Sequence, residues 1–583
     1  MTCWRSPAVL LLVALTGLLG GSALAQTAVP QVPESTRTPQ LPLQENQPPS
    51  LQPQPVPQPS LPLPNPDELL RPSPQAPATP QPVLGEVPTT IQVDRFEVVG
   101  STVFTPEELA AVTEPFTNRD ITFAELLEAR SAVTQLYVNE GYITSGAIIP
   151  PQALQAGVVT IQVIEGNLEA IDISGLTRLR LSYVHDRLEL AAQTPLNVNR
   201  LLEGLQLLQL NPLIQSISAD LQAGVRPGTS VLAVQVTEAD SFNTALSIDN
   251  GRSPSVGSFR RQVELTQANL LGFGDGLTVA YSNTDGSNTL NTSYTLPLNA
   301  RNGTLQLAIG ASDSQVIEEP FDELEISAIS RYYELTFRQP LSQTPTEEFA
   351  LGLTASRQES ETELGLDDIG PFPFSPGADE AGRTRVSAVR FFQEWTQRNS
   401  QQVIAVRSQF SLGLNLFDAT VNDDAPDSRF LAWRGQGQWV RLLTPDALLL
   451  VRGNVQLADG ALLPLEQFGL GGQQSVRGYR QDALLTDNGA LLSAEVRVPI
   501  LRISEWRGLL QLSPFADVGA AWNSGNNPDP ESNALVGVGV GLLWQQGDRF
   551  LARLDWGIPL VSSDAGDSLQ ENGVYFSLIY SPL

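Results

Sequence analysis

The chain is poor in the residues on which metal, redox and nucleophilic chemistry usually depend. Its 583 residues include one cysteine, one histidine and one methionine, and no lysine. So few thiol and imidazole groups leave almost nothing to hold zinc, copper, haem or a reactive thiol, so we expect neither a metal site nor a cofactor. A Ser-His-Asp site would have to use His185, which we expect to be a structural histidine on a helix. We therefore assign no catalytic residue and expect the protein not to be an enzyme.

Positive charge is also scarce. The chain carries 34 basic against 63 acidic residues, a formal net charge of −29. Phosphate backbones repel such a polyanion, and no clustered basic stripe offsets the repulsion, so nucleic acid is not an expected partner. Three acidic pairs, Glu318-Glu319, Asp367-Asp368 and Asp423-Asp424, are expected in solvated loops, with calcium binding as the alternative.

Long apolar runs are missing except at the N-terminus. There Arg5, the apolar stretch from Ala8 to Leu19 and the sequence Ala23-Leu24-Ala25 predict a secretory signal peptide over residues 1–25. A buried N-terminal helix is the alternative. No later run approaches the roughly 18 apolar residues of a spanning helix. An exported chain of this kind is free beyond the inner membrane, or it enters another membrane as strands.

Proline dominates residues 26–90, which hold 19 of the 44 prolines. Such a stretch lacks backbone donors and cannot bury a core, so we expect a disordered, polyproline-like linker. A simple spacer is the favoured interpretation, and a mobile segment that enters a pore is the alternative. Residues 66–71 fit one helical turn.

An internal repeat follows. The segment from Phe96 to Gly100 is echoed 75 positions later from Ile171 to Gly175, and residues 160–165 recur 73 positions later as 233–238. Matches in the same order at a nearly constant offset predict two tandem domains, each with a strand, two helices and two strands. We assign them to residues 91–167 and 168–239.

The expected helix starts agree with this repeat. Thr105 and Thr122 each precede a glutamate by three residues, which predicts capping boxes, and Asn197 is the N-cap candidate of the second domain. Small mixed domains in tandem on an exported chain indicate a binding arm. Their sheet edges are suited to accept a partner strand.

Residues 240–583 alternate with a period of two. Apolar residues from Phe242 to Ile248, from Phe410 to Leu414 and from Leu492 to Val498 alternate with small or polar ones. Short turns and longer acidic loops separate these runs. The pattern is typical of an antiparallel outer-membrane β-barrel, and the length allows on the order of 16 strands. A soluble sandwich or propeller is the alternative.

Two motifs in this region carry a resemblance to a known family. The first is Val476-Arg477-Gly478-Tyr479-Arg480, and the second comprises Phe515, Asp517 and Gly519. With the segments Gly141 to Ser145 and Asn269 to Asp275, they make the chain resemble the two-partner secretion transporters, the ShlB/FhaC/HecB or TpsB family. That family belongs to the superfamily of outer-membrane barrels with periplasmic POTRA domains.

The resemblance implies a fold, a location and a function. It implies two small α/β POTRA domains in the periplasm before a transmembrane β-barrel of about 16 strands in the outer membrane of a Gram-negative-type cell. It implies that the tip with Arg477 folds into the lumen and that Arg477 pairs with Asp517 on the barrel wall. The expected partners are outer-membrane lipid and a secreted TpsA-like protein, unfolded in transit, which the POTRA domains capture and the barrel passes to the surface. The alternatives are an assembly factor that inserts other outer-membrane proteins and, less favoured, a passive porin.

Overall fold

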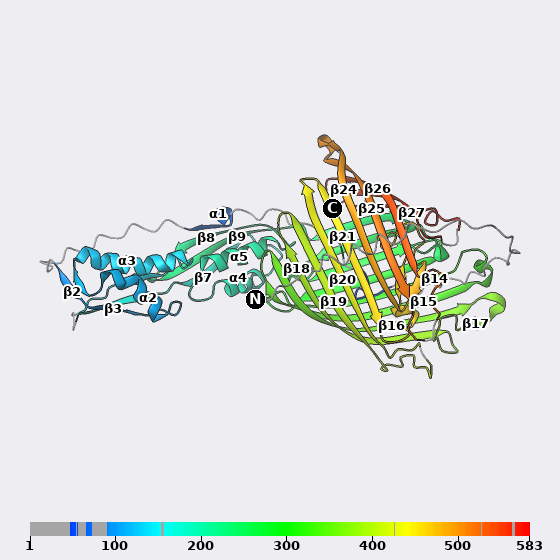
Figure 1. Cartoon of the computed structure of the whole chain (residues 1–583), viewed down its shortest axis with the longest axis horizontal. Coiled ribbons are helices and arrows are strands. Elements are labelled where there is room, and N and C mark those ends of the chain that lie inside the picture. Colours follow the sequence, from blue (N-terminus) through cyan, green and yellow to red (C-terminus); the bar gives the residue numbers. More distant parts are fainter. Residues whose placement is uncertain are drawn as a thin grey trace, which may run out of the picture. The chain divides into compact units, whose positions relative to one another are not determined.

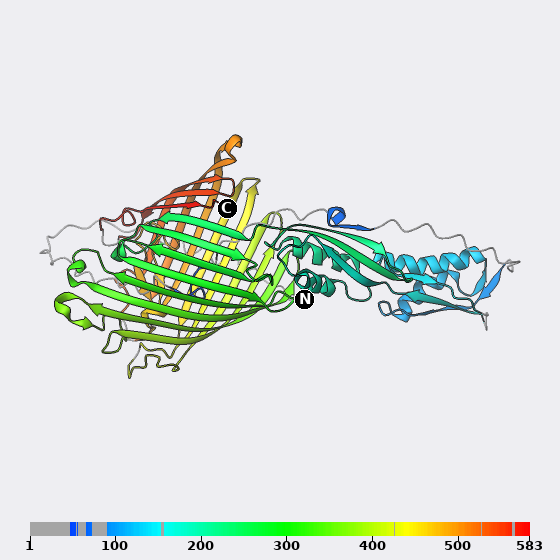
Figure 2. The ribbon, with the colours of Figure 1, turned by 180° about the vertical axis from the view of Figure 1, so that it is seen from behind.

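The computed structural model describes residues 47–53, 55, 66–72, 90–152, 157–424, 426–525, 528–562 and 566–582. The expected signal peptide, residues 1–25, lies outside the described residues. Figure 1 and Figure 2 show the small mixed domains in blue and cyan and a strand barrel in green through red. Within the described residues, no helix has the length and apolar character needed to cross a membrane.

The first mixed domain has the predicted order of elements. These are β3 (Arg95–Val99), α2 (Pro106–Thr113), α3 (Phe123–Asn139), β5 (Gly146–Ile148) and β6 (Val158–Ile164), with β2 (Ile91–Val93) and β4 (Arg119–Ile121) as a separate pair. In the sheet, β6 lies between β3, which is parallel to it, and β5, which is antiparallel. Tyr137 of α3 is fully buried in the core, and its hydroxyl donates to Ser101 at 2.6 Å.

Both predicted capping boxes of this domain are present. At α3, the Thr122 hydroxyl accepts from the backbone N–H of Glu125, and the Glu125 carboxylate accepts from the backbone N–H of Thr122 at 2.7 Å. The backbone hydrogen bond from Thr122 and the ion pair with Arg119 lower the pKa of Glu125 to about 2. These reciprocal bonds satisfy donors that the first helical turn leaves unpaired, so they define where the helix begins.

The second mixed domain repeats the same order. Its elements are β7 (Asn167–Ser174), α4 (Leu181–Ala191), α5 (Val198–Gln209), β8 (Ile214–Ala223) and β9 (Thr229–Glu238). Here β9 lies between the parallel β7 and the antiparallel β8. The Asn197 side chain accepts from the backbone N–H of Asn199 at 2.9 Å, as expected of the N-cap residue of α5. His185 lies on α4, where it is partly exposed.

Part of the proline-rich tract belongs to this second sheet. The short helix α1 (Pro66–Leu69) leads into β1 (Leu70–Pro72), which pairs with β8 in parallel. Leu69 and Leu70 are 1% and 5% exposed within the apolar core of the domain. Two buried leucines compensate for the ordering of a chain segment that is otherwise too polar and proline-rich to fold. The edge of β8 is thus occupied by the chain itself.

A second part of the tract lies against the inner wall of the barrel. Ser50 and Leu51 are 7% and 5% exposed and make hydrogen bonds to Glu334, Gln409 and Arg434, which lie on three different barrel strands. The interpretation of residues 26–90 as a simple disordered spacer is therefore wrong for residues 47–51 and 66–72. Sequence pattern missed both contacts because they depend on distant partners, 149 residues away for Leu70 and 284 residues away for Ser50 and Glu334.

The barrel is closed and antiparallel, as predicted. In the described part of the chain its wall has sixteen strands, and the two-residue β17 (Gly370–Pro371) pairs only with the end of β16. The wall strands are β10 (Phe242–Asp249), β11 (Arg260–Ala268), β12 (Gly276–Asn283), β13 (Ser287–Pro297), β14 (Thr304–Gln315), β15 (Ile326–Gln343), β16 (Glu347–Leu364), β18 (Arg383–Arg398), β19 (Gln402–Leu414), β20 (Leu431–Thr444), β21 (Ala447–Ala458), β24 (Asn488–Ile503), β25 (Gly508–Trp522), β26 (Ala534–Gln546), β27 (Phe550–Pro559) and β28 (Val574–Tyr580).

The barrel wall is polar inside and apolar outside. On β16, Thr354, Gln358 and Thr362 are buried, whereas the neighbouring Leu353 is 49% exposed. Leu307 on β14 and Phe410 on β19 are exposed in the same way. This inversion of the soluble pattern is what a lipid-facing outer surface and a wet interior require.

We predict that Thr122→Ala weakens the start of α3. Loss of an N-cap threonine typically costs about 1 kcal/mol, so amides in the first turn of α3 should exchange with solvent about fivefold faster. The measurement is hydrogen exchange of the full-length protein. Ser131→Ala, in the middle of the same helix, is the control. Equal rates in both variants would contradict the capping role.

Candidate functional site in the barrel lumen

The connection between β21 and β24, residues 459–487, folds into the barrel. It contains a short helical turn (Pro464–Glu466) and a hairpin of β22 (Phe468–Leu470) and β23 (Leu484–Thr486). Its side chains contact β18, β25 and the connection between β14 and β15, which are well separated in the order of the strands. A segment with such partners lies in the lumen, and we call it the lumen loop.

The first predicted motif, residues 476–480, lies at the tip of the lumen loop. Arg477 is fully buried there, and its guanidinium faces Asp517 on β25. Its Nε donates to Asp517 Oδ2 at 2.7 Å, its Nη2 donates to Oδ1 at 2.9 Å, and its backbone N–H donates to Oδ2 at 3.1 Å. The Arg477 Cζ lies 3.4 Å from the centre of the Phe515 ring. The structure thus brings the two sequence motifs into direct contact.

A second carboxylate, which sequence reasoning missed, completes the site. Glu495 on β24 accepts from Arg477 Nη1 at 2.8 Å, from Arg497 Nε at 2.7 Å and from Arg553 Nη2 at 2.8 Å. Its side chain is 1% exposed. Buried charges are tolerated only when paired and hydrogen-bonded, and this network meets that condition. The alternation along β24 could have predicted this position. Ser493, Glu495 and Arg497 alternate with apolar residues, so their side chains face the lumen.

Glycines in the wall make room for the tip. A Cβ on Gly537 of β26 would lie 1.9 Å from the carbonyl oxygen of Arg477, and one on Gly557 of β27 would lie 2.6 Å from the nitrogen of Gly478. A Cβ on Gly519, the last residue of the second motif, would come within 3.0 Å of the side chains of Leu470 and Val476. These positions need glycine because the loop packs directly on the wall backbone.

The other residues of the first motif anchor the tip to the last strands of the barrel. Val476 is fully buried in an apolar cluster with Leu470 and Tyr479. Gly478, with φ of +108°, donates its N–H to the Tyr575 hydroxyl at 2.9 Å. The Tyr479 hydroxyl lies 2.9 Å from the carbonyl oxygen of Val536 and accepts from the N–H of Val561 at 3.1 Å.

Arg480 ties the tip to two further connections. Its Nη1 and Nη2 donate to the two carboxylate oxygens of Glu318 at 2.9 and 2.8 Å, and Nη1 also reaches Glu571 at 3.3 Å. The expectation that Glu318 is merely a solvated loop residue is therefore wrong. The pair is bidentate, a geometry that favours arginine over other cations.

The base of the lumen loop is held at a different part of the wall. Glu466 pairs with Arg390 of β18 through two hydrogen bonds, at 2.7 Å from Nη2 and 3.0 Å from Nη1, and it accepts from Gln358 of β16 at 2.7 Å. Both ionised groups are 3% exposed or less. Nothing in the local sequence distinguishes Glu466 from an ordinary loop acid.

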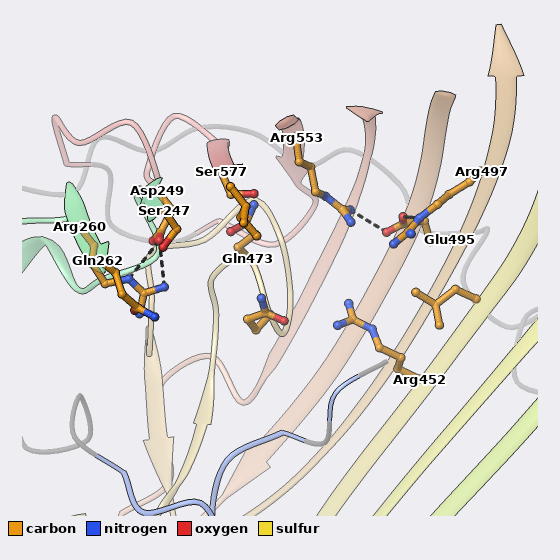
Figure 3. Close-up of a pocket in the computed structure, with 13 residues that line it drawn as sticks. Ser247, Asp249, Arg260, Gln262, Arg452, Gln473, Glu495, Arg497, Arg553 and Ser577 are labelled. Atoms are coloured by element: carbon orange, nitrogen blue, oxygen red, sulfur yellow. Dashed lines mark hydrogen bonds and ion pairs between the residues drawn. The ribbon is translucent and has the colours of Figure 1, made fainter. Parts of the chain in front are cut away.

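A cavity of about 360 Å³ lies beside the Arg477 network. Figure 3 shows Asp249, Arg260 and Ser577 on one side of it and Arg452, Glu495 and Arg553 on the other. Three ion pairs line it, Arg260 with Asp249 at 3.0 Å, Arg553 with Glu495 at 2.8 Å and Arg497 with Glu495 at 2.7 Å. A lining of mixed charge suits water or a polar chain better than an apolar ligand.

Potential metal ligands are sparse. Across the residues that the structure describes, one group of three lies close together, namely His185, Asp186 and Glu189 on the face of α4. Asp186 and Glu189 are exposed, and the contact of His185 with Asp186 at 3.3 Å is an ordinary surface pair. The lumen network joins arginines to carboxylates at hydrogen-bond distance, so it attaches the lumen loop to the barrel wall.

A polar-lined barrel with an inward-folded loop, preceded by two tandem mixed domains, defines an outer-membrane transporter of the POTRA-containing class. Comparison with known proteins gives the family. Residues 228–543 match the haemolysin secretion/activation proteins ShlB/FhaC/HecB, and residues 91–166 match the POTRA domain of ShlB type. The chain belongs to the ShlB/FhaC/HecB family of two-partner secretion transporters. Its barrel lies in the outer membrane and its POTRA domains lie in the periplasm.

Individual relatives are distant in sequence but match over most of their length. The outer membrane transporter CdiB of Escherichia coli O6:K15:H31 is 24% identical over 490 residues, 81% of this chain and 79% of that protein. The heme/hemopexin transporter protein HuxB of Haemophilus influenzae is 22% identical over 492 residues, 78% and 80% of the two chains.

Solved structures share the fold. CdiB from Escherichia coli superposes with a TM-score of 0.65 at 22% identity, covering 87% of this chain and 93% of that one. BamA from Haemophilus ducreyi lacking POTRA domains 1–3 gives a TM-score of 0.50 at 14% identity, covering 84% and 100%.

We predict that exchanging the two charges restores part of what each single change loses. Arg477→Asp or Asp517→Arg leaves a buried charge unpaired, which typically costs about 3–5 kcal/mol, so the lumen loop should lose its protection from protease. The double variant re-forms the pair, although Glu495 then repels the new carboxylate at position 477. Partial recovery of protection is expected in inserted barrels. If the double variant recovers no protection from protease, that result contradicts direct pairing.

We predict that Gly537→Ala displaces the tip without breaking an ion pair. The added methyl group would overlap the Arg477 carbonyl oxygen, so the loop must move away from β26. The matched control is Gly437→Ala on β20, where a Cβ would meet nothing within 4 Å. Hydrogen exchange across residues 471–483 should rise in the first variant only. Unchanged exchange in Gly537→Ala would show that the wall yields instead of the loop.

Proposed function

We propose that this protein captures an unfolded, exported partner protein through its POTRA domains and passes it through the barrel to the cell surface. The partner is a TpsA-like secreted protein, by analogy with the family. Transport needs no nucleotide hydrolysis in this proposal, because a partner that folds outside the cell cannot slide back. The outer surface of the barrel meets membrane lipid.

Capture by strand addition is supported by the POTRA sheets. In the described chain β8 is already paired with β1, whereas β7 forms the opposite edge of the same sheet. The edge strand β7 has eight residues, against five for β3 and three for β5. An extended polypeptide can add to such an edge through main-chain hydrogen bonds, which makes capture tolerant of sequence.

Passage is supported by the polar wall and by the way the lumen loop is attached. The buried inner face carries hydroxyl, amide and ionised groups, which can bond to the main chain of an extended polypeptide. The Arg477 network that holds the loop against β24 and β25 is the single observation that carries the proposal, since it attaches a loop to the inner wall of a barrel that belongs to a transporter family.

We predict that Arg477→Ala stops secretion after capture. Surface delivery of a large exported protein encoded beside this gene should fall at least about tenfold, because Asp517 and Glu495 lose a buried partner, and an uncompensated buried charge typically costs about 3–5 kcal/mol. A photo-crosslinker at Asp172, on β7, should still trap that protein, whereas one at Glu203, exposed on α5, should not. Arg502→Ala, which removes an exposed arginine at the end of β24 that pairs with Asp446, is the control and should secrete normally.

Other outcomes of this experiment separate the alternatives. If the variant inserts but general outer-membrane protein assembly falls, the protein is an assembly factor. A large, steady conductance that does not depend on any partner would indicate a porin. Loss of crosslinking at Asp172 with normal secretion would overturn capture at β7.

A further inference from the structure

The cavity beside the Arg477 network has more arginines than carboxylates in its lining. The charged lining residues come from β10, β11, β21, β24 and β27, and they comprise the arginines Arg260, Arg452, Arg497 and Arg553 and the carboxylates Asp249 and Glu495. A cation that is shielded from water needs a counter-charge. The partners of each arginine therefore determine what the cavity can hold.

Three of these arginines are paired with carboxylates of the wall. Arg260, Arg497 and Arg553 form the three ion pairs that line the cavity, at distances of 2.7–3.0 Å. Arg553 also pairs with Asp555 at 2.7 Å. The charge of each of these guanidinium groups is thus compensated within the protein.

Arg452 on β21 makes no ion pair with any residue that the structure describes. Its Nε makes no hydrogen bond, and its Nη2 lies 3.5 Å from the Ser493 hydroxyl oxygen, at the limit of hydrogen-bond length. Asp517 and Glu495 lie within electrostatic range of it. However, both oxygens of Asp517 accept from Arg477, and three other arginines share Glu495.

Strand register explains why Arg452 lacks an ion pair. Arg452 lies directly opposite Ser493 on β24, and Ser493 lies opposite Asp517 on β25. The neighbour across the strand pair is therefore a serine. The carboxylate is one strand further away, where Arg477 of the lumen loop binds it.

The whole cluster has an excess of one positive charge. With Arg477, Asp517 and Asp555 added to the charged lining residues, five arginines face four carboxylates. The lining also contains the side-chain amides of Gln473 and Gln474, from the lumen loop, and serine hydroxyls of β10 and β28. Amides and hydroxyls can donate hydrogen bonds to an anion. Figure 3 shows Arg452 directed into the space between the two sides of the cavity.

We propose that this cavity binds a small oxyanion, a carboxylate or a phosphate group, on Arg452. A guanidinium presents parallel N–H donors that match two oxygens of such a group. Gln473 and Gln474 can donate to the same ligand, so a bound anion joins the lumen loop to β21. The volume of about 360 Å³ accommodates the ion together with water molecules, each of which takes about 30 Å³ in the liquid. The inference goes beyond the proposed function, because the ligand is a small ion and no partner protein takes part.

Equilibrium dialysis of the full-length protein in detergent, against radiolabelled phosphate or acetate in a chloride background, tests the site. The wild type should bind each anion saturably, and the comparison of the two shows which group the site prefers. Arg452→Gln should lower the affinity at least about tenfold, because a charge-assisted hydrogen bond is lost. Arg441→Gln, which removes an exposed arginine of β20, is the matched control and should bind normally.

A second variant removes the site and keeps the arginine. Ser493→Asp adds a carboxylate opposite Arg452, and the Ser493 hydroxyl also lies 3.4 Å from Arg477 Nη2. The excess positive charge is balanced whichever arginine the new carboxylate binds, so the anion should again bind at least about tenfold more weakly. Arg452→Lys keeps the charge and should retain more phosphate binding than Arg452→Gln. Folding of each variant is checked by the heat-modifiable gel migration of the barrel.

Selenate, which has the shape of phosphate, locates the ion by its anomalous scattering in crystals of the full-length protein. A selenium peak beside Arg452 that disappears in Arg452→Gln supports the proposal. A peak that persists in that variant indicates an adventitious ion only and overturns it. The proposal is also overturned if the wild type binds neither phosphate nor acetate, or if Ser493→Asp and Arg452→Gln bind both as the wild type does.

Discussion

The buried guanidinium of Arg477 is the constraint on which the lumen depends. A cation with no exposure to water must be matched by carboxylates in fixed positions, and the barrel supplies two, Asp517 on β25 and Glu495 on β24. Those positions follow from the register of neighbouring strands, so a shift of one residue in β24 or β25 would turn a carboxylate toward lipid. The pairing therefore ties the placement of the loop to the assembly of the wall.

The barrel wall carries glycines where the tip of the lumen loop packs against it. Gly519, Gly537 and Gly557 lie where any side chain would overlap the tip. Without the loop, these wall glycines would border an empty space. With larger residues at these wall positions, the loop could not reach Asp517. The Arg480 and Glu466 pairs extend the same principle to other parts of the wall, so the loop is held at its base and its tip by separate ion pairs.

The proline-rich tract gains structure only through its neighbours. It is too poor in apolar residues to form a core alone, yet Leu69 and Leu70 pack into the second POTRA domain and Ser50 and Leu51 bond to the barrel wall. One tract therefore contacts both the domain proposed to capture a partner and the lumen proposed to convey it. Its backbone supplies most of these bonds, which is why its composition is a poor guide to them.

The sequence by itself determined the fold class, the order of elements in both POTRA domains, their helix starts at Thr105, Thr122 and Asn197, and the two motifs that meet in the lumen. Local sequence patterns predict these features, namely the periodicity of apolar residues, the capping residues and the internal repeat. Only the tertiary structure decided that Glu495 shares Arg477, that Arg390 holds Glu466, that Glu318 binds Arg480 and that residues 47–51 lie on the inner wall. The physical reason is that these contacts join segments that are separate in the chain and that only the closed barrel brings together. An acid that forms a buried pair also has the same local sequence pattern as an acid that faces solvent.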